Sequence, residues 1–167
     1  MKRKHLLRHI RIPANENSIY KLEAFIEQIC DDFHIYDVYF GNIMASNTLA
    51  IEMCSYTAGE NEFNVDIFFA AKPSGMYFTI KLYDYFLDIV KYYDIIKDKD
   101  ADDPDAFKGE WHRMMMIKLL CDKININAQE ESIELVFFIT GLNERLTNQR
   151  IELLEKYYSI ITATINQ

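Results

Sequence analysis

The chain has 167 residues and a mass of 19.8 kDa, and 50% of its residues are hydrophobic. A domain of this size and composition can bury a core without disulfides or a structural metal. The formal net charge of −8 disfavours nucleic acid and anionic membrane surfaces as partners, unless a local basic patch overrides the average.

The apolar segments are too short for membrane insertion. No apolar run exceeds the five residues 135–139, so no transmembrane helix is expected. Basic residues interrupt the apolar ones near the N-terminus, so no signal-peptide core is expected either, and the sequence predicts a cytoplasmic protein. The basic cluster is expected to form the solvated start of an edge strand, and it consists of Lys2, Arg3, Lys4, Arg8 and Arg11.

The N-terminal part predicts one strand and two helices. Residues 5–12 have the pattern of a strand, which Pro13 closes. Asn15, Asn17 and Ser18 are suitable N-caps for the first helix. That helix is apolar at three- and four-residue spacing, at Ile19, Leu22, Phe25, Ile26, Ile29, Cys30 and Phe33. After a turn over residues 34–41, a second helix is predicted over residues 43–56.

The remainder predicts two hairpins and two further helices. Strands over residues 64–71 and 77–83 are joined by a turn at Pro73, Ser74 and Gly75. The acidic residues 94–109 have the composition of a long loop, and a helix follows around Met114 to Cys121. Strands over residues 123–128 and 132–140 form the closing hairpin, and residues 148–165 form an amphipathic helix. We expect its packed face to consist of Ile151, Leu154, Tyr158, Ile161 and Ile165.

This order predicts the α+β class: a two-layer sandwich of a mixed, mostly antiparallel sheet with helices on one face and an extra C-terminal helix. The absence of repeats and of Gly/Ser linkers favours a single domain. We assign residues 1–142 to its main body and residues 143–167 to a C-terminal helical extension.

Four segments stand in the order and spacing of a known fold: HIRIPANENSIYKLEAFIEQIC, NTLAIEMCSYTA, FTIKLYDYF and HRMMMIKLLCDKININAQEESIELVFFI. Over about residues 5–142 they resemble the histidine-kinase-like (GHKL) ATPase superfamily, and most closely its anti-sigma-factor serine-kinase branch. In that family the segments hold, in turn, the first strand and helix, the helix with a Glu and an Asn, the strand ending in the adenine-binding Asp, and the last helix with its hairpin.

The resemblance implies a carboxylate that polarises the attacking hydroxyl and, four residues later, an amide oxygen that holds Mg²⁺. One alignment of NTLAIEMCSYTA places Met53 and Thr57 at these positions, and an alignment shifted by one residue places Glu52 and Tyr56 there. Neither alignment supplies both groups. The sequence therefore predicts no catalytic residue, with Glu52 as the substitute carboxylate if the protein is active.

The family also uses glycines where the backbone approaches the nucleotide. Phe86 stands where the resemblance implies a glycine after Asp84, and it is expected to fill the adenine pocket. Trp111 and Arg113 stand in place of the glycine-rich entry to the third helix. The remnant of the cofactor site then comprises Thr57, Asp84, Phe86, Trp111 and Arg113.

We therefore expect a regulatory domain that binds a protein, such as a sigma factor or an anti-sigma antagonist, without a cofactor or phosphoryl transfer. The alternative is an ATP-binding anti-sigma factor or serine protein kinase, in which Glu52, Thr57 and Asp84 replace the missing groups and Mg-ATP is the cofactor. Neither nucleic acid nor a membrane is an expected partner. The C-terminal helix is expected to pack on its own domain, or else on a second copy in a homodimer or on the regulatory partner.

Other chemistries find little support. Asp98, Asp100 and Asp102 have the spacing of calcium ligands, but the sixth and twelfth loop positions are unsuitable. No zinc-binding motif is present, so no metal is expected. No nucleophile elbow is present either, which gives no support to a serine nucleophile. The three cysteines are expected to be buried thiols, and Met114, Met115 and Met116 to fill the core. Of the tyrosines, the pairs Tyr92–Tyr93 and Tyr157–Tyr158 fit an interface or half-buried packing equally well.

Overall fold

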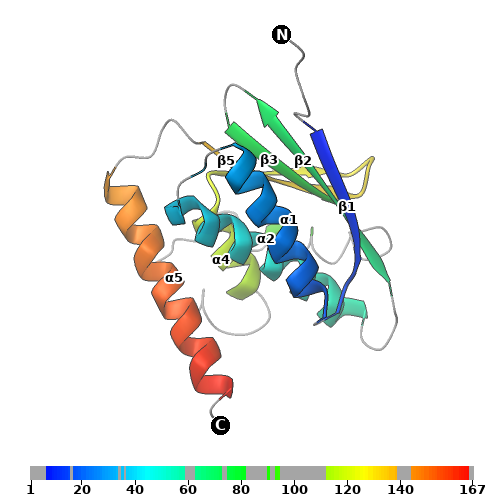
Figure 1. Ribbon diagram of the computed structural model, residues 1–167. Helices are drawn as coiled ribbons and strands as arrows, with labels where there is room; N and C mark the ends of the chain where they lie inside the picture. Colours follow the sequence, from blue (N-terminus) through cyan, green and yellow to red (C-terminus); the bar gives the residue numbers. More distant parts are fainter. Residues whose placement is uncertain are drawn as a thin grey trace.

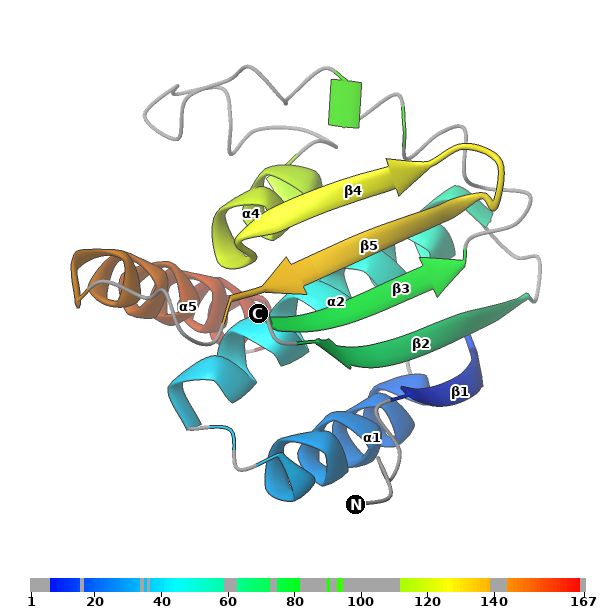
Figure 2. The same cartoon turned by 90° about the horizontal axis from the view of Figure 1, so that it is seen from above.

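The computed structural model describes residues 7–15, 17–33, 35, 37–58, 63–72, 75–81, 90, 93–94, 112–138 and 144–165. For residues 54–58, 144–151, 164 and 165 it describes the backbone alone. The described chain is α+β, with five antiparallel strands and with helices on one face of the sheet (Figures 1 and 2). The predicted fold class is confirmed at this level, although every described strand pairing is antiparallel rather than mixed.

The sheet has the strand order β1-β2-β3-β5-β4 (Figure 2). Its strands are β1 (Leu7–Pro13), β2 (Asn64–Lys72), β3 (Gly75–Lys81), β4 (Lys123–Asn127) and β5 (Ser132–Phe137). The two predicted hairpins, β2–β3 and β4–β5, are both present. Apolar residues at alternate positions of β2, β3 and β5 are buried against the helices. This alternation is the pattern from which the sequence predicts these strands.

Strand β1 is an edge strand whose basic residues pair with acidic partners. Arg11 donates from Nε and Nη2 to the two carboxylate oxygens of Asp66 on β2, at 2.8 and 3.0 Å. His9 Nε2 lies 2.8 Å from the same carboxylate, which is only 2% exposed. Arg8 pairs with Asp32 at 2.5 Å. The predicted edge position of β1 is confirmed, and Arg8 and Arg11 attach the strand to its neighbours. Lys2, Arg3 and Lys4 of the predicted basic cluster lie outside the described residues.

Helix α1 (Ser18–Asp32) begins where the N-cap residues predict it. Asn17 occupies the cap position without a capping bond from its own side chain. The Asn15 side chain supplies the acceptor instead, since its Oδ1 receives the Asn17 backbone N–H at 3.0 Å. Ser18 Oγ lies within hydrogen-bonding distance of the Pro13 carbonyl, which ties the helix start to the end of β1.

Helix α2 (Asp37–Ala58) begins six residues earlier than predicted, because Gly41 belongs to the helix and not to a turn. A Cβ at position 41 would lie 3.1 Å from Leu154 Cδ1 of helix α5 (Glu144–Ile165). The small residue therefore makes room for a neighbouring helix. Between residues 42 and 53 every side chain except Glu52 is buried, which explains the weak amphipathic pattern of this helix.

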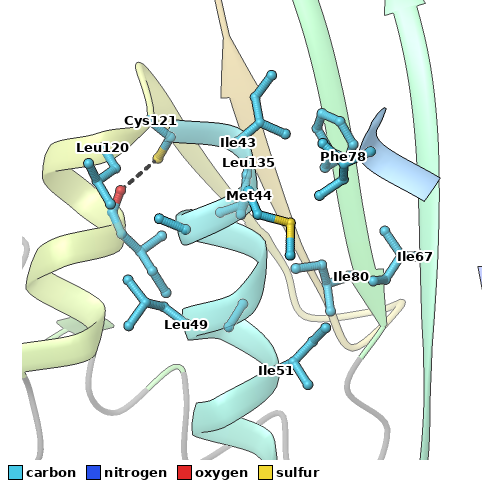
Figure 3. Packing of buried hydrophobic residues seen from close by; sticks show 14 of the residues in the cluster. Ile43, Met44, Leu49, Ile51, Ile67, Phe78, Ile80, Leu120, Cys121 and Leu135 are labelled. Atoms are coloured by element: carbon cyan, nitrogen blue, oxygen red, sulfur yellow. Dashed lines mark hydrogen bonds between the residues drawn. The ribbon is translucent and has the colours of Figure 1, made fainter. Parts of the chain in front are cut away.

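The core lies between α2 and the sheet. Ile43, Met44 and Ile51 of α2 approach Phe78 and Ile80 of β3 (Figure 3). Helix α4 (His112–Leu120) packs along α2, and its three methionines, residues 114–116, are all buried, as predicted. The Cys121 thiol donates to the Ile117 carbonyl at 3.0 Å (Figure 3), and Cys30 is buried as well.

Gly75 allows β3 and β5 to come close together. Its φ is +153°, and a Cβ there would lie 2.3 Å from the Phe137 carbonyl oxygen. No side chain could be accommodated at this distance. The predicted turn residue thus belongs to β3, where a neighbouring backbone requires glycine.

Helix α5 packs on α2 and α4 through a face that coincides only in part with the predicted one. Of the predicted residues, Leu154 contacts the core and Ile161 is half-buried, whereas Tyr158 is 50% exposed. Leu153 and Tyr157, which were not predicted, also contact the core. The packed stripe is therefore rotated about the helix axis by roughly one residue, because Tyr157 rather than Tyr158 faces α2 and α4. The side chains of Ile151 and Ile165 lie outside the description. Among the described helices, none is long and apolar enough to span a bilayer.

Candidate functional site

Helices α2, α4 and α5 enclose a groove of about 950 Å³, which we call the α5 groove. Leu49, Met116, Leu153, Ile160 and Ile161 form its apolar surface. Its polar lining residues are Glu52, His112, Arg113, Glu152, Glu155, Lys156, Tyr157 and Ser159. A pocket of this size, with apolar walls and a few polar groups, has the character of a binding site.

Two of the sequence-predicted site residues meet in this groove. Arg113 Nε, at the start of α4, donates to Glu52 Oε2 on α2 at 3.3 Å. The two side chains are 31% and 36% exposed, so water screens the pair, and its contribution to stability is at most about 1 kcal/mol. The contact nevertheless places a donor from α4 against the only described carboxylate that α2 contributes to the groove.

Tyr157 lies beside this ion pair. Burial and the nearby Glu52 carboxylate raise the pKa of Tyr157 to about 12, despite the opposing effect of Arg113. The phenol therefore remains protonated at neutral pH and can act as a hydrogen-bond donor, but not as a base. Tyr157 therefore adds a protonated phenol to the polar lining of the groove, beside the Glu52–Arg113 pair.

Of the remaining predicted site residues, the structure describes only the backbone of Thr57. Thr57 lies in the last turn of α2, and its side chain is outside the described set. Asp84, Phe86 and Trp111 lie outside the described residues, as does the acidic segment apart from Asp94. The expectation that Phe86 fills the adenine pocket therefore stays a prediction.

The two alignments of α2 place different residues at the family's carboxylate position, and these residues have different surroundings. Met53 is 5% exposed and belongs to the hydrophobic core. Glu52 borders the α5 groove. Only the alignment that selects Glu52 therefore gives a side chain that a ligand in this groove could reach, and that alignment lacks the amide four residues later.

Two buried asparagines of α2 were not singled out by the sequence analysis. Asn42 Nδ2 donates to the Leu120 carbonyl at 3.4 Å, and Asn47 Nδ2 to the Ile43 carbonyl at 2.9 Å. Within the described part of the chain, neither side-chain oxygen has a hydrogen-bond partner. In the sequence, Asn42 and Asn47 stand out only as polar residues in an apolar stretch. Sequence alone cannot distinguish such buried polar residues from those of an exposed helix face.

Metal and thiol chemistry gain no support among the described residues. No group of three or more His, Cys, Asp or Glu side chains there could hold a metal ion. Burial, with a smaller contribution from Asp31, raises the pKa of the Cys30 thiol to about 11, so it stays protonated and unreactive at neutral pH. The side chain of Cys54 lies outside the description.

Comparison of the chain with models of known protein families and with curated protein sequences finds no match.

Proposed function

We propose that the chain is a regulatory domain that binds another protein through a degenerate histidine-kinase-like ATPase scaffold and transfers no phosphoryl group. The observation that carries this proposal is the Glu52–Arg113 ion pair. The carboxylate nearest to the family's catalytic position is engaged by a cation from α4, and the alternative residue, Met53, is in the core. The element order of the described chain also supports the scaffold.

In this proposal the protein acts in the cytoplasm, and its partner is a regulatory protein such as a sigma factor or an anti-sigma antagonist. The scaffold then provides surfaces rather than a reaction centre. Co-purification from the native cell, followed by mass spectrometry, would identify the partner.

One observation favours the alternative, an ATP-binding anti-sigma factor or serine kinase. Between residues 42 and 53, Glu52 alone is not buried, and it borders a groove of about 950 Å³. In that alternative, Arg113 would contact phosphate and Glu52 would act as the substitute carboxylate.

Nucleotide binding decides between the two. We expect millimolar Mg-ATP to leave the melting temperature of the full chain unchanged within about 1 °C. A nucleotide present at 100 times its Kd would add about 2.7 kcal/mol of stability, which corresponds to a rise of several degrees in a domain of this size. Such a rise would contradict the proposal. If Glu52→Gln then abolished it, the kinase alternative would be favoured, while a rise unaffected by Glu52→Gln would place the nucleotide elsewhere.

A further inference from the structure

The α5 groove has walls that suit a helix better than a compact ligand. All three of its sides are helices, and its lining residues on α5 extend from Glu152 to Ile161. At about 1.5 Å per residue these positions span about 14 Å, or roughly two and a half helical turns. An added helix would complete a four-helix arrangement with α2, α4 and α5.

The groove also offers apolar surface at the right places. Leu49 and Met116 line the groove but are only 1% and 6% exposed, so they offer little surface to a ligand. Its accessible apolar surface comes from α5, where Leu153 and Ile161 are half-buried and Ile160 is 67% exposed. Amphipathic helices bind such grooves through residues spaced at i, i+4 and i+7, which cover about 10 Å along the helix axis.

The charge of the groove discriminates between partners. Glu52 and Arg113 neutralise one another, which leaves the exposed Glu152 and Glu155 against Lys156. The whole chain carries a net charge of −8. In a symmetric homodimer each copy would bring Glu152 and Glu155 to the other's groove, so like-charge repulsion disfavours that arrangement. A helix flanked by basic residues is complementary.

We propose that the α5 groove binds a basic amphipathic helix of the partner protein, with the apolar face of that helix against Leu153, Ile160 and Ile161. The inference rests on the proposed protein-binding function and specifies where and by what chemistry the partner is recognised. It makes α5 part of the recognition surface and not only a cover for α2.

The probes are two synthetic 16-residue amphipathic peptides with the same leucine and alanine positions, one with lysine and one with glutamate at the polar positions. Binding to the full chain is measured by fluorescence anisotropy at physiological salt. Ile160→Lys removes the exposed apolar contact. Tyr20→Lys is the matched control, because Tyr20 is 77% exposed on α1 and the change in net charge is the same.

We expect the lysine peptide to bind at least tenfold more tightly than the glutamate peptide. Ile160→Lys should weaken it about tenfold, while Tyr20→Lys should change its Kd less than twofold. Equal losses in both variants would indicate non-specific charge attraction, and absence of binding or equal binding of the two peptides would likewise overturn the inference. Self-association that Ile160→Lys abolishes would assign the groove to a second copy and also overturn the inference.

The Mg-ATP measurement is a separate readout. Stabilisation by nucleotide with intact peptide binding would refute the proposed absence of nucleotide chemistry and leave the groove assignment in place.

Discussion

The amide groups of Asn42 and Asn47 have different consequences although both are buried in α2. Asn42 donates to the Leu120 carbonyl at the end of α4, one of the last carbonyls of a helix, which lack intrahelical partners. Asn47 donates to the Ile43 carbonyl, four residues earlier in the same helix. That carbonyl already has the regular helical partner, so the Asn47 bond adds little.

We expect Asn47→Leu to raise the free energy of unfolding by about 1 kcal/mol, because it removes an amide oxygen without a described partner and keeps the same side-chain branching. Asn42→Leu should be less favourable than Asn47→Leu, since it deprives the Leu120 carbonyl of its donor. Urea denaturation with unchanged m values would measure both. A loss of more than about 1 kcal/mol for Asn47→Leu would show that its amide is needed.

Individual site residues could be named from the sequence, but their neighbours could not. Glu52 and Arg113 were selected separately, through a resemblance, and the structure brings them together across 61 positions. Tyr157 was recognised only as part of a tyrosine pair. Its place beside Glu52 depends on how α5 packs, which local spacing does not determine.

At the scale of elements, the best predictions came from segments with one buried face. Strands β2 and β4 end within one residue of the predicted limits, because alternation and turn residues agree there. Helix α2 was predicted to begin six residues too late, because glycine usually signals a turn and Gly41 has a tertiary role instead. For α5, the predicted stripe runs through Tyr158, whereas in the structure Tyr157 contacts the core, because packing against other helices and not local spacing sets the rotation of the helix.

The contact between Gly41 and Leu154 can be tested by a double-mutant cycle. In the wild-type background, Gly41→Ala should gain little, because the new methyl would meet Leu154 Cδ1 at 3.1 Å and offset the better helix propensity. In a Leu154→Ala background the same change should stabilise the protein by up to about 1 kcal/mol. We expect a coupling of at least about 0.5 kcal/mol from thermal or urea unfolding. Additive effects would mean that α5 does not pack on Gly41.

At the scale of the whole molecule, packing is uneven. The layer between α2 and the sheet is closed, with Ile43, Ile67 and Phe78 completely buried. Helix α5 has the α5 groove on one side and a second pocket of about 540 Å³ on the other, lined by Asp37, Val38 and Gly41 of α2. Fewer apolar contacts per residue therefore hold α5 than hold α2, and local stability should follow this difference.

Native-state hydrogen exchange should resolve this hierarchy. Amides in the middle of α2, β2 and β3 should exchange only through global unfolding, whereas those of α5 should exchange at a free energy lower by about 2 kcal/mol or more. Leu154→Ala should lower the free energies at which the α5 amides exchange and leave those of β2 and β3 nearly unchanged, because Leu154 lies against Gly41 of α2. Tyr158→Ala, on the exposed side of α5, is the control and should have a smaller effect.

If α5 and α2 instead exchanged in a single step, α5 would belong to the cooperative core and would form a rigid wall of the α5 groove. A separately opening α5 would instead allow the groove to widen around an incoming helix.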